Sequence, residues 1–315
     1  MYLCIQNKHF MEKFYTGDPS DIIQFFPKFN LQIHCCRYWW IKHWEHESLS
    51  FPFWRIYNND QKGAYMEFEK TIVAMDPDKL YLIAPNTNFS SKLYNYPIPK
   101  VKHNLKGGHI SGFTQKEHNT LINEGAIDHL FIHFTLGYPY DLVAPGIYTF
   151  NKDKYLEQKI NLLKNYLKIK IAEFNFTIFL TIESLICELL SKLDEDVWRF
   201  LVRDVRVIKV INHIENNIHK DFSNESLADI ANMATNSFSR LFKEHTGDTL
   251  QLFITKKRIH SASLLLLHSD LSIDSIAEQT GFTNRYHFTR VFSKITGKAP
   301  AKYKKESLYY GFFET

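Results

Sequence analysis

The residues of this sequence best suited to chemistry are two arginines, each in a copy of one pentapeptide. Residues 238–242 read FSRLF and residues 288–292 read FTRVF, and Thr-Gly follows both copies after the same interval. A guanidinium beside a hydroxyl group can donate hydrogen bonds to the base edges of a nucleic acid. The repeat, at an offset of 288 − 238 = 50 residues, therefore predicts two similar reading surfaces in one chain.

Helical spacing gives each copy an inner and an outer face, because residues at i, i+3 and i+4 share one side of a helix. The residues predicted to face inward are Phe238, Leu241, Phe242, Phe288, Val291, Phe292 and Ile295. Those predicted to face outward are Asn236, Ser239, Arg240, Lys243, Arg285, Tyr286, Thr289, Arg290 and Ser293. Gly247 and Gly297 should end the two helices, since the left-handed residue after a helix favours glycine.

A shorter helix is predicted before each copy, over residues 223–231 and 272–279. Ser223 and Ser272 are suitable N-caps for these helices, and Gly281 marks the turn in the second copy. Two helices joined by a tight turn, the second with a polar arginine face, form the helix-turn-helix arrangement.

One uninterrupted helix is predicted between the two units, because residues 249–268 contain neither Gly nor Pro. At 1.5 Å per residue, its 20 residues span roughly 30 Å. B-DNA presents the same face of its major groove every ~34 Å. A rigid connector of this length can place two recognition helices in successive major grooves.

Charge is distributed as expected for a polyanion-binding C-terminal region. From Arg203 to Glu306 there are 16 basic and 11 acidic residues, a net charge of +5. The rest of the chain has 38 − 16 = 22 basic and 34 − 11 = 23 acidic residues, a net charge of −1. The excess is small, so it supports the motif without establishing DNA binding by itself.

Four segments of this region match a known pattern: SLADIANMA, FSRLFKEHTGDTLQLF, RIHSASLLLLHSDLSIDSIAEQTGF and YHFTRVFSKITGKAPAKYK. With them, residues 205–305 resemble the DNA-binding domain of the AraC/XylS family of bacterial transcription regulators. The resemblance implies DNA contacts from Thr235, Asn236, Ser239, Arg240, Lys243, Arg285, Tyr286, Thr289 and Arg290. Ala234 departs from the family, which usually has a capping serine there, so Thr235 is expected to cap instead. The alternative role for Arg240 and Arg290 is a salt bridge to acidic neighbours.

The N-terminal region has the pattern of a β domain. Short aromatic and β-branched runs at 53–57, 63–75, 79–84 and 129–137 predict strands, which pack as a small barrel or a sandwich. Residues 30–137 resemble the cupin-like effector-binding domains found in many AraC-family members. The predicted fold class is therefore α+β: a cupin-like antiparallel β-barrel, a helical bridge, and an all-α domain with two helix-turn-helix units.

Aromatic residues suggest a ligand site in the β domain, because their faces can hold sugar rings or planar ligands. Strand alternation places Arg55 and Tyr57 on the face opposite Trp54 and Ile56. The candidate effector-binding residues are Trp39, Trp54, Arg55, Tyr57, Tyr65 and Tyr81. The alternative, that these aromatics only fill a small core, has equal support from the sequence.

Fifteen histidines raise the question of a metal site. No His-x-His pair is present, and His43 and His46 lie in KHWEHES, which reads as an exposed charged turn or, alternatively, as a helix that brings both imidazoles together. His129 and His133 are about 13 Å apart along an extended strand, too far to chelate one ion. They are expected to line a cavity or to lie in a core. No catalytic residues, cofactor or metal are expected, and the protein is not expected to be an enzyme.

The organisation predicted from these patterns has four parts. They are a sensor domain (1–150), a helical bridge suited to dimerisation (151–200), the DNA-binding domain (201–306) and a tail (307–315). The apolar faces of the helices in this bridge could instead pack on the barrel. No signal peptide or membrane span is evident, and the four cysteines read as reduced core thiols of a cytoplasmic protein.

The function predicted from the sequence is effector-controlled, sequence-specific regulation of transcription. The partners expected are double-stranded operator DNA, a small-molecule effector such as a sugar, RNA polymerase and a second copy of the chain, with no membrane. Two alternatives stay open: a constitutive DNA-binding regulator whose barrel only dimerises, and a cupin enzyme tethered to DNA.

Overall fold

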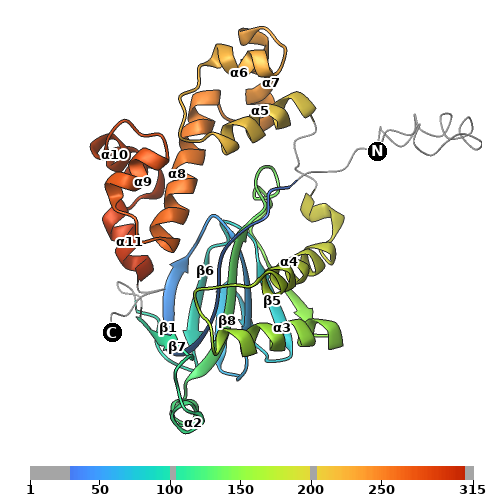
Figure 1. Cartoon of the computed structure of the whole chain (residues 1–315), viewed down its shortest axis with the longest axis vertical. Coiled ribbons are helices and arrows are strands. Elements are labelled where there is room, and N and C mark those ends of the chain that lie inside the picture. Colours follow the sequence, from blue (N-terminus) through green and yellow to red (C-terminus); the bar gives the residue numbers. More distant parts are fainter. Residues whose placement is uncertain (1–28, 100–103, 199–203, 309–315) are drawn as a thin grey trace, which may run out of the picture.

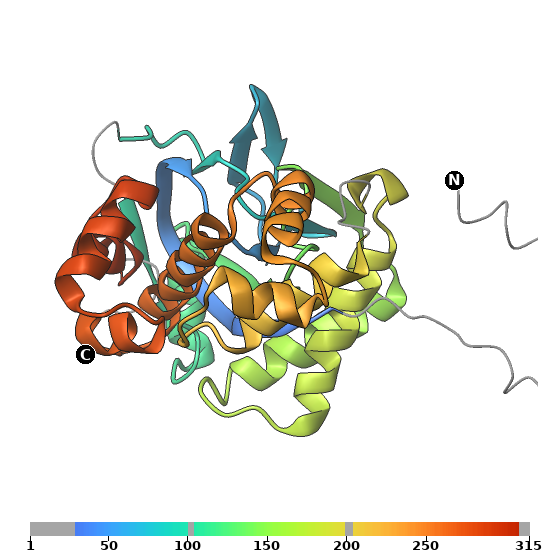
Figure 2. The same ribbon diagram turned by 90° about the horizontal axis from the view of Figure 1, so that it is seen from above.

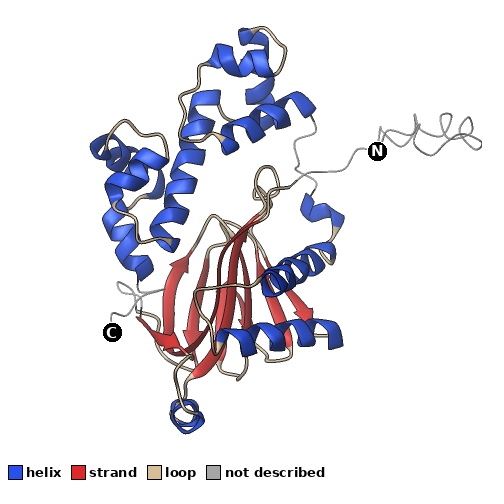
Figure 3. Ribbon diagram, viewed as in Figure 1, coloured by secondary structure: helices blue, strands red, loops and turns tan. Residues whose placement is uncertain are grey.

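The computed structural model describes residues 29–99, 104–198 and 204–308, and Figure 3 shows its strands gathered in one region with helices beside and beyond them. Of the predicted tail, only residues 307 and 308 lie within this part, at the end of helix α11 (Pro300–Leu308). None of the helices described is long and apolar enough to cross a membrane.

The N-terminal strands form one nine-stranded antiparallel sheet. They are β1 (Gln32–Leu49), β2 (Trp54–Asn59), β3 (Ala64–Phe68), β4 (Thr71–Ala74), β5 (Lys79–Ile83), β6 (Phe89–Leu93), β7 (Asn104–His109), β8 (Ile127–Thr135) and β9 (Ile147–Asn151). Their order is β4-β3-β6-β1-β8-β2-β5-β9, and β7 pairs with β1. The four runs predicted as strands correspond to β2, to β3 and β4, to β5 and to β8.

This sheet curls on itself around a buried inner core. Met66 on β3 and Ile83 on β5 belong to the same apolar cluster, although four other strands separate β3 from β5 in the sheet. Within the described residues, the edge strands β4 and β9 do not pair with each other, so the sheet is a half-barrel. The predicted barrel-like antiparallel fold is confirmed, and the sandwich alternative is excluded.

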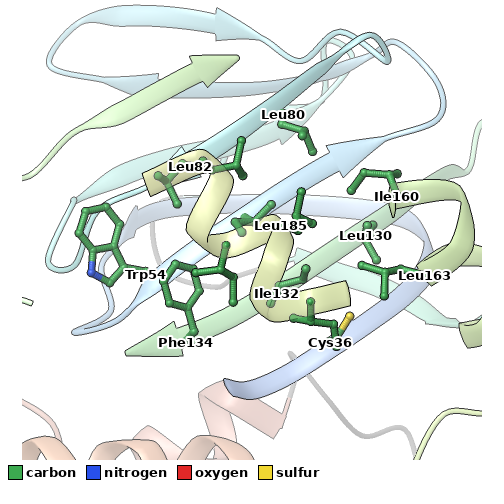
Figure 4. Close-up of a cluster of buried hydrophobic side chains, with 14 of the residues drawn as sticks. Cys36, Trp54, Leu80, Leu82, Leu130, Ile132, Phe134, Ile160, Leu163 and Leu185 are labelled. Atoms are coloured by element: carbon green, nitrogen blue, oxygen red, sulfur yellow. The ribbon is translucent and has the colours of Figure 1, made fainter. Parts of the chain in front are cut away.

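Two helices cover the outer face of the half-barrel, α3 (Lys154–Leu167) and α4 (Phe176–Ser191) (Figure 1). Their apolar seams meet the strands in an outer core in which Ile160, Leu163 and Leu185 pack among Trp54 and Ile132 (Figure 4). The predicted helices are confirmed, and one seam of each packs on the sheet.

Two local expectations are wrong. Residues 43–49 form neither a helix nor an exposed turn, because β1 runs through them and the side chains of Glu45 and His46 are fully buried. The structure also contains a helix that the sequence reading missed, α2 (Gln115–Asn123), which begins with a capping box between Thr114 and Glu117. Cys187 is exposed on α4, so it is not a core thiol.

The C-terminal helices form two units joined by α8 (Leu250–His268), and Figure 2 shows one unit at each end of this helix. The others are α5 (Val205–Asn216), α6 (Asn224–Ile230), α7 (Thr235–Thr246), α9 (Ile273–Gln279) and α10 (Arg285–Thr296). We call α5–α7 with the start of α8 the first unit, and the end of α8 with α9–α11 the second unit. Each has its own core, built on the Phe238–Phe242 pair or the Phe288–Phe292 pair.

Helix ends in both units follow the predicted capping chemistry. Ser223 accepts a hydrogen bond from the backbone N–H of Ser226, and Ser272 does the same for Ser275. Gly247 ends α7 with φ of 77°, a left-handed conformation that costs glycine least. Gly297 ends α10 in the same way.

Candidate nucleic-acid interface and ligand cavity

Helix α7 presents the polar face predicted for the first unit. Asn236, Arg240 and Lys243 are exposed, while Ser239 is half-buried. Phe238 and Phe242 lie on the opposite side with no exposed surface, because they fill the core of the unit.

The start of α7 differs from the expectation. Ala234 is the N-cap residue and supplies no side-chain hydrogen bond, and Thr235 is the first residue of the helix rather than its cap. The first recognition helix therefore begins with its N-terminal amide groups uncapped by any side chain within the described structure.

Helix α10 presents the corresponding face of the second unit. Arg285, Tyr286 and Arg290 are exposed, Tyr286 at 86%, and Thr289 is half-buried. The Asn284 side chain caps the helix by accepting a hydrogen bond from the His287 N–H. One predicted orientation needs correction: Ile295 is 41% exposed, because it lies near the C-terminal end of the helix.

The two arginines of the repeated pentapeptide have no acidic partner within the residues described. Neither Arg240 nor Arg290 forms an ion pair there, so the salt-bridge alternative is not realised. Arg285 differs from them, since its guanidinium lies 3.2 Å from the Asp274 carboxylate. Arg240 and Arg290 are thus available to donate hydrogen bonds to an external acceptor.

Helix α8 is held to both units by Arg258 at its middle. The guanidinium donates hydrogen bonds to the carbonyl oxygens of Ile218 and Lys220, at 3.1 and 2.7 Å, between α5 and α6. The guanidinium also lies against Gly281 in the turn of the second unit. A Cβ atom on residue 281 would lie only 2.8 Å from it. The predicted connector helix is confirmed, and at 1.5 Å per residue its 19 residues span about 28 Å.

A loop of the β domain docks into the first unit. Tyr138, between β8 and β9, is buried in the first unit's core with its ring 5.5 Å from that of Phe253. Its backbone N–H donates to the Glu215 carboxylate, which also pairs with Lys257 at 2.5 Å. The two halves of the chain are thus connected by apolar packing and by a hydrogen bond to a carboxylate.

The inner face of the half-barrel holds a cavity next to the end of α8. The empty volume of this cavity, counted together with its opening to solvent, is about 660 Å³. The residues that line it are Cys35, Arg37, Trp39, Ile41, Trp44, Phe51, Phe53, Tyr57, Leu105, His129, Phe131, His133, Leu267 and His268. All come from the β domain except Leu267 and His268, which belong to α8.

The structure brings together two of the six candidate effector-binding residues. Trp39 and Tyr57 line the cavity. Trp54 lies in the outer core on the other face of the sheet, as strand alternation predicts relative to Tyr57. Tyr65 is half-buried on β3, and the Tyr81 hydroxyl donates to the Ala74 carbonyl at 3.1 Å.

Arg55 is fully buried beside the cavity wall and already has partners. Its Nη2 donates to the Thr87 carbonyl at 3.2 Å, and its guanidinium lies 5.3 Å from the Phe51 ring and 4.9 Å from the Phe89 ring. These contacts offset part of the cost of burying the guanidinium.

Two histidines expected to be cavity or core residues do line the cavity. Burial lowers the pKa of His129 to about 3, and its Nδ1 lies 2.6 Å from the Asn59 amide oxygen. Burial also lowers the pKa of His133 well below its usual value. Both rings are therefore neutral at neutral pH.

The contribution of α8 to the cavity was not predictable from local sequence. Leu267 and His268 follow a run of leucines that indicates only helix and core, and more than a hundred residues separate them from the strands they approach. Arg37, Phe51 and Phe53 were also missed as cavity residues.

Comparisons with known proteins agree with this geometry. Residues 227–306 match the family described as Helix-turn-helix domain. An uncharacterized HTH-type transcriptional regulator of Haemophilus influenzae is 33% identical over 106 residues, which cover 34% of this chain and 36% of that relative. The probable transcriptional regulator LumQ of Photobacterium leiognathi is 27% identical over 157 residues, which cover 49% of this chain and 62% of LumQ.

Two solved structures are also similar to parts of this chain. The DNA-binding domain of AdpA, determined with a target DNA, is 27% identical, covers 34% of this chain and 97% of its own, and has a TM-score of 0.33. ToxT from Vibrio cholerae is 13% identical, and the similar region covers 89% of this chain and 99% of ToxT, with a TM-score of 0.46. The C-terminal part of this chain is thus an AraC-type helix-turn-helix domain. The match spans about a third of the first curated relative.

Proposed function

We propose that this protein is a sequence-specific DNA-binding transcription regulator whose DNA binding is controlled by a small molecule. The observation that carries the proposal is the pair of recognition helices, α7 and α10, at the two ends of one rigid helix. Each exposes a hydroxyl–arginine face, and Arg240 and Arg290 have no ion-pair partner in the described part of the chain. Arginine side chains of this kind read guanine in the major groove.

The DNA contacts proposed are those of the two exposed faces. In the first unit they are Thr235, Asn236, Ser239, Arg240 and Lys243, and in the second Arg285, Tyr286, Thr289 and Arg290. Tyr286 and the two arginines of α10 are larger than Asn236 and Ser239, so the second unit should read more bases. A regulator of this kind acts in the bacterial cytoplasm and contacts RNA polymerase.

The cavity of the half-barrel is the proposed effector site. Its lining is mostly aromatic and apolar, with Arg37 and several histidines as polar groups, which is typical of pockets for small organic molecules. Leu267 and His268 connect it to α8, so an occupant touches the helix that sets the spacing of the two recognition helices. A ligand that favours one position of α8 would shift DNA affinity by its differential binding to the two states.

Bridge helices α3 and α4 support the proposal of a homodimer. One side of each packs on the sheet, but Tyr155, Leu162, Phe176 and Leu180 are exposed on the other side. Exposed apolar residues grouped on neighbouring helices are typical of a surface that pairs with another protein. Pairing of two chains would add avidity for a repeated operator.

Selection of DNA from a random pool by the full-length chain tests the proposal. We expect enrichment of a motif with two conserved blocks about one helical turn apart. The Arg290→Ala variant should lose the base preference at one block while retaining weak binding to unselected DNA. Enrichment of no motif would contradict the proposal.

A thermal-shift screen with sugars, aromatic acids and other small organic molecules tests the effector site. A hit should raise the unfolding temperature of the wild-type chain and change its DNA affinity. The effect should be lost in Trp39→Ala, which lines the cavity, and retained in Tyr155→Ala on the far side of the sheet. A chain that binds DNA but responds to no organic ligand would favour constitutive regulation.

A further inference from the structure

Three potential metal ligands converge in the cavity wall where α8 meets the sheet. Cys35 on β1, His133 on β8 and His268 at the end of α8 each offer one ligand atom, and the three atoms lie within 4.8 Å of one another. Cys35 and His133 are directly paired across the two strands, so the sheet fixes their relative position. His268 comes from the other half of the chain.

The two imidazoles have nitrogen atoms that the protein leaves without a partner. Nδ1 of His133 and Nε2 of His268 are buried and form no hydrogen bond in the described structure. Buried polar atoms are nearly always paired, because burial without a partner costs free energy. Two such atoms lie in the same cluster, where their lone pairs are open to a ligand from outside the chain.

We propose that Cys35, His133 and His268 bind a divalent transition-metal ion of the zinc type. A thiolate and two imidazoles are preferred ligands of Zn²⁺, and three protein ligands leave the fourth tetrahedral position for water or another small ligand. Binding forms one metal–sulfur and two metal–nitrogen bonds, and the Cys35 thiol releases its proton to solvent. No electron transfer is involved.

The present geometry needs only small movements to hold such an ion. Bonds of about 2.0–2.3 Å place tetrahedral ligand atoms about 3.4–3.6 Å apart, so ligand atoms up to 4.8 Å apart must close by roughly an ångström. His268 packs against two other rings, since its ring lies 5.6 Å from those of His34 and Phe53.

A metal bound here would connect the two halves of the chain. His268 is the last residue of α8, and the neighbouring Leu266 is buried in the core of the second unit. Cys35 and His133 belong to the half-barrel. The ion would therefore fix the end of α8 against the sheet and hold the second unit in one position.

Cobalt titration of the metal-free, reduced full-length chain tests the site directly. We expect one Co²⁺ per chain, with a thiolate-to-cobalt charge-transfer band that Zn²⁺ removes by displacement. Cys35→Ser should abolish this band, while Cys187→Ser, the matched change at an exposed cysteine on α4, should retain it. A band that survives in Cys35→Ser, or no band in the wild-type chain, would overturn the proposal.

A second variant keeps the test decisive if Cys35→Ser does not fold. His268→Gln should weaken cobalt binding at least tenfold, whereas His219→Gln, an exposed histidine of the first unit, should leave it unchanged. Hydrogen exchange should slow on metal addition at the end of α8 in the wild-type chain and not in His268→Gln. Equal protection in both would show that the ion does not connect the two halves. These readouts need no DNA, so they stand or fall independently of the proposed regulatory function.

Discussion

The two helix-turn-helix units share one architecture but differ in how they connect to the β domain. In the first unit, Tyr138 of the β domain is part of the core, and Glu215 accepts a hydrogen bond from its backbone N–H. The second unit's core, within the described residues, contains only residues of that unit, and His268 at the end of α8 contacts the rings of His34 and His133 in the β domain.

The units also differ at their recognition helices. Helix α7 starts at Ala234 without a side-chain cap, and its outward residues Asn236 and Ser239 are short. Helix α10 is capped by Asn284 and exposes Arg285 and Tyr286. We therefore propose different roles for the two units. The first is anchored to the β domain, and the second makes more of the contacts with bases.

A change in the rotation of one unit relative to the other should reduce DNA affinity more than any other change considered. Two alanines inserted after Thr255 keep α8 helical but rotate one unit by about 200° relative to the other. The insertion lies between Ile254 of the first core and Ile259 of the second, so both cores stay intact. We expect binding to a two-block operator to fall to the level of a one-block operator, measured by gel shift. Unchanged affinity would show that the units are not geometrically coupled.

Removal of the anchor should strongly destabilise the first unit. Tyr138→Ala deletes a buried aromatic ring, and we expect a loss of about 3–5 kcal/mol in the free energy of unfolding, measured with urea. Tyr138→Phe is the matched control, because the buried Tyr138 hydroxyl has no hydrogen-bond partner and its removal should cost little. Equal losses in both variants would contradict the assignment to packing.

Arginine truncation compares base reading by the two units. Arg290→Ala should weaken binding to the selected operator by about 1–3 kcal/mol and leave binding to random DNA nearly unchanged. Arg240→Ala should have a smaller effect if the first unit reads fewer bases. An equal loss on operator and random DNA would instead place Arg290 on a phosphate.

Helix capping gives the smallest and most local comparison. Ala234→Ser supplies the missing cap on α7 and should raise the free energy of unfolding by about 1 kcal/mol. Asn284→Ala removes the cap of α10 and should lower it by a similar amount. Thermal unfolding of both variants shows whether each substitution raises or lowers stability. If Ala234→Ser leaves stability unchanged, another group already binds the free N–H groups at the start of α7.

The features predicted well from the sequence depend on local patterns. Apolar residues at helical spacing identified Phe238 and Phe242 as core, and glycine and serine identified the helix ends, because each signal lies within a few residues of its effect. KHWEHES was misread for the opposite reason. Glu45 and His46 look like exposed residues, and only the pairing of β1 with β6 and β7 explains their burial.

The cavity of the half-barrel could be predicted only in part. Trp39 and Tyr57 were found from aromatic content, but Trp54 faces the outer core, since residues at odd spacing on a strand point to opposite faces. His268 reaches the cavity through the docking of α8 on the sheet, a long-range contact with no local signal. The three proposed metal ligands were missed for the same reason.

Hydroxyl-radical footprinting of the full-length chain on its selected operator tests the central claim most directly. Two recognition helices held by α8 should protect two patches on one face of the duplex, centred about 10–10.5 base pairs apart. Arg290→Ala should weaken one patch more than the other. A single protected patch, or two patches on opposite faces, would contradict the proposal that α8 places both units in successive major grooves.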